Sequence, residues 1–282
     1  MKRIIKIIIF YISDILDLLL LFIRFFAHGR VKYPLASTNC REVSVLGNGP
    51  SLKSFIGNNK YNIGDAICVN FSPLTDEFYR IKPQYLILID PGLFHIEDSH
   101  VKDLSLAIKE KVVWPLTIVI NRPNLDIAKK LYGCYNVRFI LLPQITFEPR
   151  TNTFIKLKYR LFRKGLTMPS AQNVAIAAIF IAINGGYKNI SLYGLEHSWL
   201  EDTYISKDNV PCLRDRHYYG VKDVPWDFNP DGTPWKLYQL LDALSLVFKG
   251  YCDLQTYADY LGEIRIINKT KGSWIDAFER EA

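Results

Sequence analysis

Paired cysteines are absent from this chain of 282 residues, and their absence excludes several classes of small protein. The five cysteines are widely scattered, and none belongs to a Cys-x-x-Cys pair. A zinc knuckle needs such pairs, and a disulfide-rich domain needs regularly spaced cysteines, so neither is indicated. Reduced thiols in the cytoplasm are the simplest interpretation.

Runs of basic residues are missing as well, although the formal net charge is +7. Such an excess is compatible with a nucleic-acid partner. Without a lysine- or arginine-rich run, and with much of the excess near the N-terminus, we expect no nucleic acid. The composition is 49% apolar and 22% charged, which is typical of a globular protein long enough for one large domain.

The N-terminal segment 1–33 lacks an uninterrupted apolar core. Asp14 and Asp17 interrupt it, and no small-residue cleavage site follows. A secretory signal needs such a core and such a site. A spanning helix needs ~20 apolar residues in a row, so it too is disfavoured.

The same segment instead has the pattern of an amphipathic helix. At ~100° per residue, its polar side chains fall within one arc of roughly 120°. These are Lys2, Arg3, Lys6, Ser13, Asp14, Asp17 and Arg24. The remaining circumference is Ile, Leu and Phe, so we expect a membrane-associating helix over 1–33 and a peripheral protein on the cytoplasmic face of the inner membrane. The alternatives are packing on its own domain, packing on a second subunit in a homo-oligomer, and a true span.

From Arg41 onward, apolar runs rich in β-branched residues alternate with helical patterns. The predicted strands are 43–46, 66–70, 85–90, 117–120, 137–142, 189–193 and 263–267. The predicted helices are 51–57, 100–110, 124–132, 170–184, 234–249 and 273–280. This alternation favours an α/β domain over 41–282 with a Rossmann-like, doubly wound, mostly parallel sheet. Ser170 is the expected N-cap of its helix, Gly185-Gly186 the expected stop, and the irregular segments 143–168 and 198–233 are expected lid loops.

A glycine-rich hexapeptide, Gly47-Asn48-Gly49-Pro50-Ser51-Leu52, directly follows the first predicted strand. A strand that ends in glycines and then opens a helix can leave backbone N–H groups free for an anion. The motif is neither a Gly-x-Gly-x-x-Gly fingerprint nor a P-loop. It predicts a phosphate-binding turn, with a simple tight turn as the alternative.

Polar residues also follow the other predicted strands. Asn70 ends the second strand, Asp90 ends the third, and Gly194, Glu196 and His197 follow the strand at 189–193. In a doubly wound sheet these ends meet at one crevice, where ligands bind. The alternative for each is a capping or turn residue.

Several motifs then occur in the order found in one enzyme family. They are the hexapeptide, Asn70, Asp90-Pro91-Gly92-Leu93-Phe94, Ser170-Ala171, Gly186-Tyr187-Lys188-Asn189-Ile190, Leu192-Tyr193-Gly194 and His217-Tyr218-Tyr219-Gly220. Over roughly residues 42–250 this pattern resembles the bacterial family 42 sialyltransferases. It also resembles a related group of uncharacterised proteins, domain of unknown function 115.

The resemblance implies a single GT-A-like nucleotide-binding domain that uses a CMP-activated sialic acid and needs no metal or other cofactor. By resemblance, the donor-binding residues would be Gly47, Asn48, Gly49, Pro50, Ser51, Asn70, Asp90, Ser170, Gly194 and Glu196. Tyr204 and Tyr218 would donate hydrogen bonds to the departing phosphate, and a histidine would deprotonate the acceptor. The family histidine aligns near Val221, so His217 and His197 are both candidates. Asp90 stands in place of an asparagine and Ser198 in place of a tyrosine.

The sequence therefore predicts a glycosyltransferase. We expect it to move a CMP-linked nonulosonic acid, or a similar nucleotide-activated sugar, to a surface polysaccharide or lipid-linked glycan. One alternative is a pyrophosphokinase-like enzyme, although no Asp-x-Asp pair stands at a strand end to hold magnesium. The other is a non-catalytic nucleotide-binding subunit of a polysaccharide assembly complex.

Overall fold

Eight strands form the central sheet in the order β11-β10-β6-β1-β2-β3-β4-β5, and every neighbouring pair is parallel. The computed structural model describes residues 2–28, 41–53, 63–143, 145–217 and 220–281. The strands are β1 (Glu42–Leu46), β2 (Asp65–Val69), β3 (Tyr85–Leu88), β4 (Leu116–Ile120), β5 (Val137–Leu141), β6 (Asn189–Tyr193), β10 (Arg265–Asn268) and β11 (Glu279–Arg280). The predicted Rossmann-like α/β fold is confirmed.

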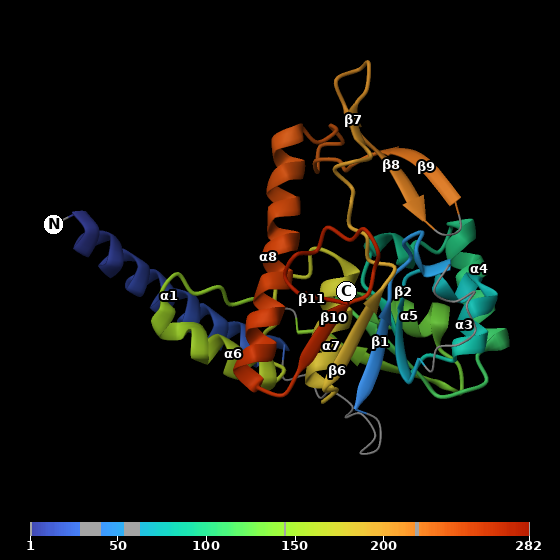
Figure 1. Cartoon of the computed structure of the whole chain (residues 1–282), viewed down its shortest axis with the longest axis horizontal. Coiled ribbons are helices and arrows are strands. Elements are labelled where there is room, and N and C mark those ends of the chain that lie inside the picture. The colour runs from blue at the N-terminus through green and yellow to red at the C-terminus, as the bar shows by residue number, and fades with distance from the viewer. Residues whose placement is uncertain (1, 29–40, 54–62, 144, 218–219, 282) are drawn as a thin grey trace.

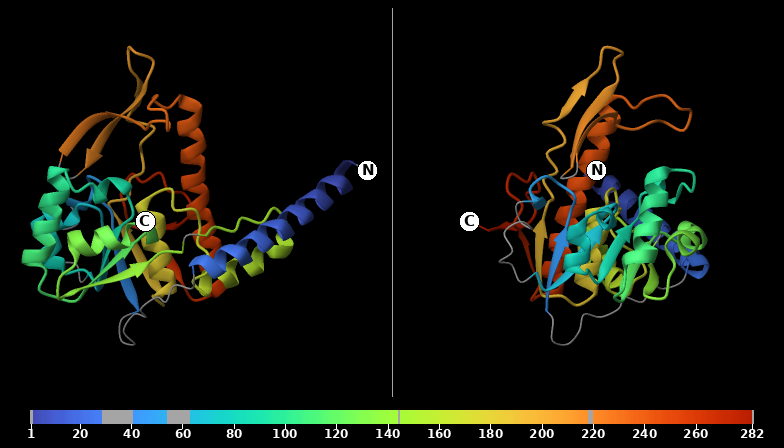
Figure 2. Two further views of the ribbon diagram at one scale, coloured as in Figure 1. Left: turned by 180° about the vertical axis from the view of Figure 1, so that it is seen from behind. Right: turned by 90° about the vertical axis from the view of Figure 1, so that its right-hand side faces the viewer.

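Helices cover both faces of this sheet (Figures 1 and 2). One layer holds α6 (Ile155–Arg163), α7 (Val174–Asn184) and α8 (Leu237–Leu261), and the other holds α3 (Asp76–Ile81), α4 (Ser99–Lys111) and α5 (Leu125–Tyr132). Side chains alternate between the layers: Val45 packs in the first core and Leu46 in the second. Burial on both faces explains why the strands are continuous apolar runs.

The ends of the helices differ in places from the prediction. Asn173, and not Ser170, is the N-cap of α7, because its side chain accepts from the N–H groups of Ala175 and Ile176. Gly185 caps the other end as expected. The predicted helix 273–280 is wrong. The Ser273 hydroxyl donates to the carbonyl of Leu195 at 2.7 Å, which holds this segment in a turn before β11.

The expected loop 198–233 is largely a second, antiparallel sheet of β7 (Thr203–Ile205), β8 (Pro211–His217) and β9 (Gly220–Pro225). It rises above the carboxyl ends of the central strands beside α8 (Figures 1 and 2). Short 3-10 turns complete the chain at η1 (Ser72–Leu74), η2 (Pro91–Phe94), η3 (Arg122–Asn124) and η4 (Asn152–Phe154).

Helix α1 (Lys2–His28) lies against α6 and extends away from the body of the protein (Figures 1 and 2). The prediction of an irregular lid over 143–168 is corrected here, because part of this segment is helical and packs against α1. Leu21 of α1 forms a small core with Ile145 and Phe147. Within the described residues, no helix combines the length and apolarity that a membrane span requires.

Candidate functional site

The order in which the chain adds strands to the sheet reverses between β1 and β6. The chain winds outward from β1 to β5 and then returns to place β6 on the other side of β1. In doubly wound folds, ligands bind beyond the strand ends at such a point. A cavity of about 560 Å³ lies there, and its wall includes Gly47, Asn70 and Asp90 beyond β1, β2 and β3, Glu196 beyond β6, and Asp215 of β8. The structure thus brings together residues that the sequence placed at one crevice.

The glycine-rich turn after β1 packs directly against the turn after β6. The N–H of Gly47 donates to the carbonyl of Tyr193 at 2.8 Å, and that of Gly49 donates to Gly194 at 2.9 Å. A Cβ on Gly47 would lie 2.2 Å from the Gly194 oxygen. The glycines are therefore needed for this close approach of two backbone segments.

The carboxylate of Glu196 occupies the start of the helical turn at Ser51. Its Oε1 accepts from the Ser51 N–H at 2.6 Å, and a Cβ on Gly49 would lie 1.6 Å from Oε2. The turn's dipole attracts negative charge, and the protein's own carboxylate already supplies it. Oε2 is buried and has no hydrogen-bond partner among the described residues. The predicted anion site is thus filled from within, and an unpaired acceptor remains.

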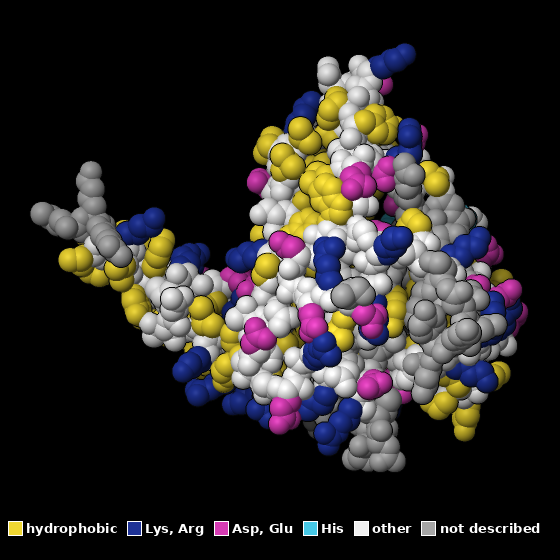
Figure 3. All heavy atoms as spheres, viewed as in Figure 1, with side chains coloured by type: hydrophobic (Ala, Val, Ile, Leu, Met, Phe, Trp, Pro, Cys, Tyr) yellow, Lys and Arg dark blue, Asp and Glu magenta, His cyan; other side chains and the backbone are white. Residues whose placement is uncertain are grey.

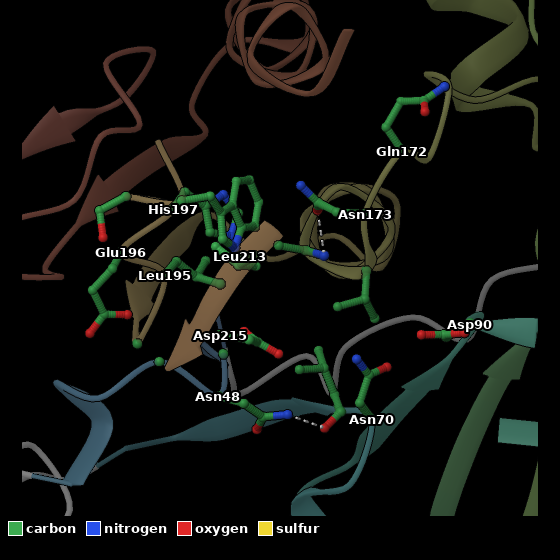
Figure 4. A pocket seen from close by; sticks show the side chains of 18 of the residues that line it. Asn48, Asn70, Asp90, Gln172, Asn173, Leu195, Glu196, His197, Leu213 and Asp215 are labelled. Atoms are coloured by element: carbon green, nitrogen blue, oxygen red, sulfur yellow. Dashed lines mark hydrogen bonds between the residues drawn. The ribbon is translucent and has the colours of Figure 1, made fainter. Parts of the chain in front are cut away.

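Two asparagines close the floor of the cavity (Figure 4). Asn48 donates from Nδ2 to the carbonyl of Val69 at 3.3 Å. Asn70 has a left-handed backbone with φ of 49°, and Figure 4 shows its amide directed into the cavity. The Oδ1 of Asn70 is buried without a hydrogen-bond partner in the described part of the chain. An unpaired buried acceptor in the wall of a cavity is typical of a functional site.

Asp90, after β3, is exposed at the rim of the cavity. Its carboxylate accepts from the N–H of Gly92 at 2.8 Å and so caps η2. A capping role accounts for its local geometry, and its place in the wall also lets it reach a ligand.

His197 lines the opposite side of the cavity, and its ring is held from two directions. It stacks on Trp199 with 4.3 Å between ring centroids, and its Nδ1 lies 2.9 Å from the hydroxyl of Tyr251 on α8. Burial lowers the pKa of His197 to about 3. A base with that pKa takes up protons poorly at neutral pH, so this geometry suits a neutral hydrogen-bonding group better than a general base.

The antiparallel sheet and its flanking loops form the upper wall. They contribute Asp202, Arg214, Asp215 and Asp227. Figure 4 shows Asp215 directed toward the space above Asn48 and Asn70. Arg214 is the only lysine or arginine among the described residues that line the cavity.

The other predicted site residues lie away from the cavity or are not among the residues that the structure describes. Ser170 does not line the cavity, although the next three residues do. Tyr204 lies on β7, is exposed and does not line it either. His217 ends β8, but its side chain is outside the described residues, as is the whole of Tyr218.

Sequence reasoning missed three residues of the site: Asn173, Trp199 and Tyr251. Asn173 stands at the start of a strongly apolar helix, which is an N-cap signal that Ser170 obscured. Trp199 follows His197 by two positions, and its aromatic character alone did not distinguish it from a core residue. Tyr251 lies within the long helix α8 and gave no signal of its own. Within the described residues, no group of three or more His, Cys, Asp or Glu side chains could hold a metal ion.

No protein-family model matches the sequence, and no curated protein is detectably similar to it. Several solved structures match over most of this chain, among them the following three. The MAf glycosyltransferase of Magnetospirillum magneticum AMB-1 is 15% identical with a TM-score of 0.48, over 90% of this chain and 36% of that one. The sialyltransferase Cst-I of Campylobacter jejuni is 20% identical with a TM-score of 0.43, over 90% of this chain and 85% of that one. CstII from Campylobacter jejuni, solved with cytidine-5'-monophosphate, is 16% identical with a TM-score of 0.40, over 86% of this chain and 85% of that one.

This chain thus spans about a third of the Magnetospirillum protein and most of each Campylobacter sialyltransferase. At such low identities the likeness describes the fold. The functional argument rests on the residues of this chain.

Proposed function

We propose that this protein is a glycosyltransferase that takes a nucleotide-activated sugar in the cavity between β1, β6 and the antiparallel sheet. The donor we favour is a CMP-linked nonulosonic acid, such as sialic acid or a relative. The acceptor is a cell-surface polysaccharide or a lipid-linked glycan, and no metal or other cofactor takes part. This proposal follows the motif resemblance, because parts of several of its motifs line one cavity, among them residues 47–50, Asn70, Asp90 and Gly194.

One observation carries the proposal furthest. Asn70 Oδ1 and Glu196 Oε2 are buried acceptors without partners among the described residues, and both side chains belong to the cavity wall. Buried polar atoms are normally paired, so a ligand with several O–H or N–H donors fits here. A nucleoside supplies both, in the hydroxyls of its ribose and the amino group of cytosine. An apolar ligand would leave these acceptors unpaired.

The reaction we propose is a direct displacement at the anomeric carbon of the donor. A bond forms between that carbon and the acceptor oxygen, and the bond to the phosphate oxygen breaks, so that CMP leaves with the electron pair. His217 takes the acceptor proton. Arg214, and hydrogen bonds from Tyr204 and Tyr218, favour departure of the phosphate.

A lipid-linked acceptor suits an enzyme that lies on the cytoplasmic face of the inner membrane. Confinement to that surface raises the effective concentration of such an acceptor. This localisation is part of the proposal and is supported by the exposed apolar side of α1.

Thermal shift with a nucleotide panel tests the donor class. We expect CMP to stabilise the protein in the presence of EDTA, and ligand at 100 times its Kd raises the free energy of unfolding by about 2.7 kcal/mol. Stabilisation by ATP with magnesium alone would overturn the proposal in favour of a pyrophosphokinase-like enzyme. CMP binding without transfer of sugar to any glycan acceptor would favour a non-catalytic nucleotide-binding subunit.

A pair of asparagine variants locates the site. Asn70→Gly keeps the left-handed backbone that glycine adopts freely and removes the amide. Asn209→Gly is the matched control, because Asn209 is also left-handed, with φ of 56°, but is exposed and outside the cavity wall. We expect the first to weaken CMP binding about tenfold and the second to leave it unchanged. Equal affinities for the two variants would exclude this cavity as the CMP site.

A further inference from the structure

Helix α1 turns Asp14 and Asp17 toward the protein and a broad apolar side outward, the reverse of a helix on a soluble domain. Asp14 is fully buried and accepts from the N–H groups of Arg150 and Thr151 at 2.8 and 2.9 Å. The hydroxyl of Thr151 adds a third bond at 2.6 Å, and Asp17 pairs with Arg150 at 2.7 Å. These contacts determine which side of α1 remains outside.

The outward side of α1 is apolar throughout residues 4–23. At ~100° per residue, every side chain in an arc of roughly 160° opposite Asp14 is exposed, and none of them is polar. Leu16 is 54% exposed, whereas Leu21 on the docked side is 7% exposed. The arc includes Ile8, Ile12, Leu16, Leu19, Leu20 and Ile23. A contiguous apolar surface of this size marks an interaction site.

The helix beside α1 supplies positive charge. Lys156, Arg160 and Arg163 of α6 are all exposed, and Figure 3 shows basic side chains gathered over α6 next to the apolar α1. A second copy of this chain docked symmetrically on α1 would bring two such basic helices toward each other, which charge repulsion opposes. An anionic surface complements both helices at once.

We propose that α1 and α6 together form a binding surface for an anionic lipid bilayer. The outward side of α1 lies at the boundary between headgroups and acyl chains, and the basic side chains of α6 contact lipid phosphates. The contacts of Asp14 hold α1 in the orientation that this requires. The proposal deepens the membrane localisation proposed above, but it does not depend on the transfer reaction.

Co-sedimentation of the full chain with vesicles tests this surface. We expect binding to vesicles that contain phosphatidylglycerol, weaker binding to pure phosphatidylcholine, and a loss of the difference in high salt. Leu16→Glu/Leu20→Glu should lower the partition coefficient at least tenfold. The matched control is Leu106→Glu/Val113→Glu on and after α4, since Leu106 is also 54% exposed; it should bind like the wild type.

A charge variant distinguishes the contribution of α6 to vesicle binding from that of α1. Lys156→Glu/Arg160→Glu should lower binding to anionic vesicles at least fivefold and leave binding to phosphatidylcholine unchanged. Equal binding by the α1 variant, the α4 control and the wild type would overturn the proposal. So would a dimer in solution that the α1 variant disrupts while no vesicle is bound, because the covering partner would then be a second copy.

Independently of α1, three side chains form a hydrogen-bonded chain that ends at the cavity. Asn173 Oδ1 accepts from the N–H groups of Ala175 and Ile176 at the start of α7, at 2.9 and 3.1 Å. Its Nδ2 donates to the hydroxyl of Tyr251 at 2.9 Å. That hydroxyl lies 2.9 Å from Nδ1 of His197, and 3.2 Å from the already occupied Asn173 Oδ1.

These contacts determine the direction of each bond. The helix N-terminus fixes Oδ1 of Asn173 as an acceptor, so Nδ2 faces Tyr251. The hydroxyl of Tyr251 accepts that bond, and its own proton has the shorter path to His197. Nδ1 of His197 is then an acceptor, and the neutral ring carries its proton on Nε2. Burial raises the pKa of Tyr251, which keeps the hydroxyl protonated.

We propose that Tyr251 is a positioning residue that holds His197 as the neutral Nε2–H tautomer. His197 then offers an N–H donor, and not a base, to an anionic or carbonyl oxygen in the cavity. The stacking of Trp199 and the left-handed backbone of His197, with φ of 50°, fix the plane of the ring.

Nitrogen-15 NMR of the histidine side chains tests the tautomer without any substrate. We expect the His197 signals to show protonated Nε2 and bare Nδ1 at pH 7, and Tyr251→Phe to change these shifts. Tyr257→Phe is the matched control, because Tyr257 is also fully buried on α8 and donates to Asn184 at 2.8 Å, away from the cavity. It should leave the His197 signals in place.

Turnover gives a second measurement. If the protein transfers sugar, Tyr251→Phe should lower kcat about tenfold with little change in KM, and Tyr257→Phe should keep kcat within twofold of the wild type. A wild-type His197 protonated on Nδ1 would overturn the proposal whatever the reaction is. Identical His197 signals in the wild type and Tyr251→Phe would overturn it as well.

Discussion

The carboxylate of Glu196 accepts a hydrogen bond from the backbone N–H of Ser51, although 145 positions separate the two residues in the sequence. This contact joins the turn after β1 to the turn after β6 on either side of the point where the sheet reverses. The two turns therefore act as one structural unit, and a change in either one should move the wall of the cavity.

Gly49→Ala tests this unit. A Cβ at this position would lie 1.6 Å from Oε2 of Glu196 and 2.8 Å from the carbonyl oxygen of Gly194, so atoms must shift. We expect the free energy of unfolding, measured in urea, to fall by about 1–3 kcal/mol, the usual cost of overpacking. In a Glu196→Ala background the loss should be smaller, because the closest clash is gone. Gly92→Ala is the control, since its Cβ would meet nothing closer than 3.3 Å. If Gly49→Ala lowers the free energy of unfolding equally in the two backgrounds, the Glu196 carboxylate does not lie against Gly49.

Most of the fold was predictable because its strands have a pattern that few other structures share. Runs such as 116–120 are buried along their whole length, and only a parallel sheet covered on both faces accommodates several of them. The ends of elements were less predictable. Ser170 and Asn173 are both good caps by residue type, and only the contact of Asn173 with Tyr251, 78 positions away, distinguishes them.

The candidate site was predictable in place but not in detail. Topology alone brings the ends of β1, β2, β3 and β6 together, so Asn48, Asn70, Asp90 and Glu196 were found. The sequence did not reveal that the Glu196 carboxylate accepts from the Ser51 N–H, because this contact depends on how the turns after β1 and β6 pack together. Residues 143–168 were mistaken for a lid because α6 buries Lys158, and its ion pairs with Glu148 at 2.7 Å and Asp253 at 3.0 Å depend on tertiary contacts that the sequence does not show.

Asp14→Asn should release α1 from the body of the protein. Burial alone would raise the pKa of the Asp14 carboxyl. Hydrogen bonds from the Thr151 hydroxyl and from the N–H groups of Arg150 and Thr151 have the larger, opposite effect, so the pKa of Asp14 lies below its usual value. The amide cannot accept all three bonds, so we expect a loss of about 1–3 kcal/mol in the docking of α1. Hydrogen exchange of α1 amides measures this opening. Asp17→Asn removes only a half-exposed ion pair and should cost at most about 1 kcal/mol; an equal effect from both would contradict the buried contact.

The stability of the protein should fall in mild acid because of His197. Its pKa is about 3 in the folded protein and about 6.5 when unfolded. Between these values the unfolded chain binds the extra proton, so the free energy of unfolding rises with pH and this contribution is complete above about pH 6.5. At pH 5 we expect a loss of about 2 kcal/mol relative to pH 7 from this group. His197→Asn tolerates the left-handed backbone and should flatten the slope between pH 4 and 6. An unchanged slope would show that His197 titrates normally.

Arg214→Ala should weaken binding of an anionic nucleotide without unfolding the protein. Arg214 is the only lysine or arginine among the described residues of the wall, which also include five acidic residues, Asp90, Glu196, Asp202, Asp215 and Asp227. Its partner Asp223, at 3.3 Å, is half-exposed, so this ion pair adds little to stability. Loss of a charge-assisted hydrogen bond to phosphate costs about 1.5–3 kcal/mol, and we expect CMP affinity, measured by calorimetry, to fall at least tenfold.

Arg265→Ala is the control, because Arg265 forms a comparably exposed pair with Glu279 on β11, at the far edge of the sheet. Cytidine, which lacks the phosphate, should bind the wild type and Arg214→Ala equally. If CMP binds both equally as well, the phosphate lies away from Arg214, and the N-terminus of α7 becomes the position to test.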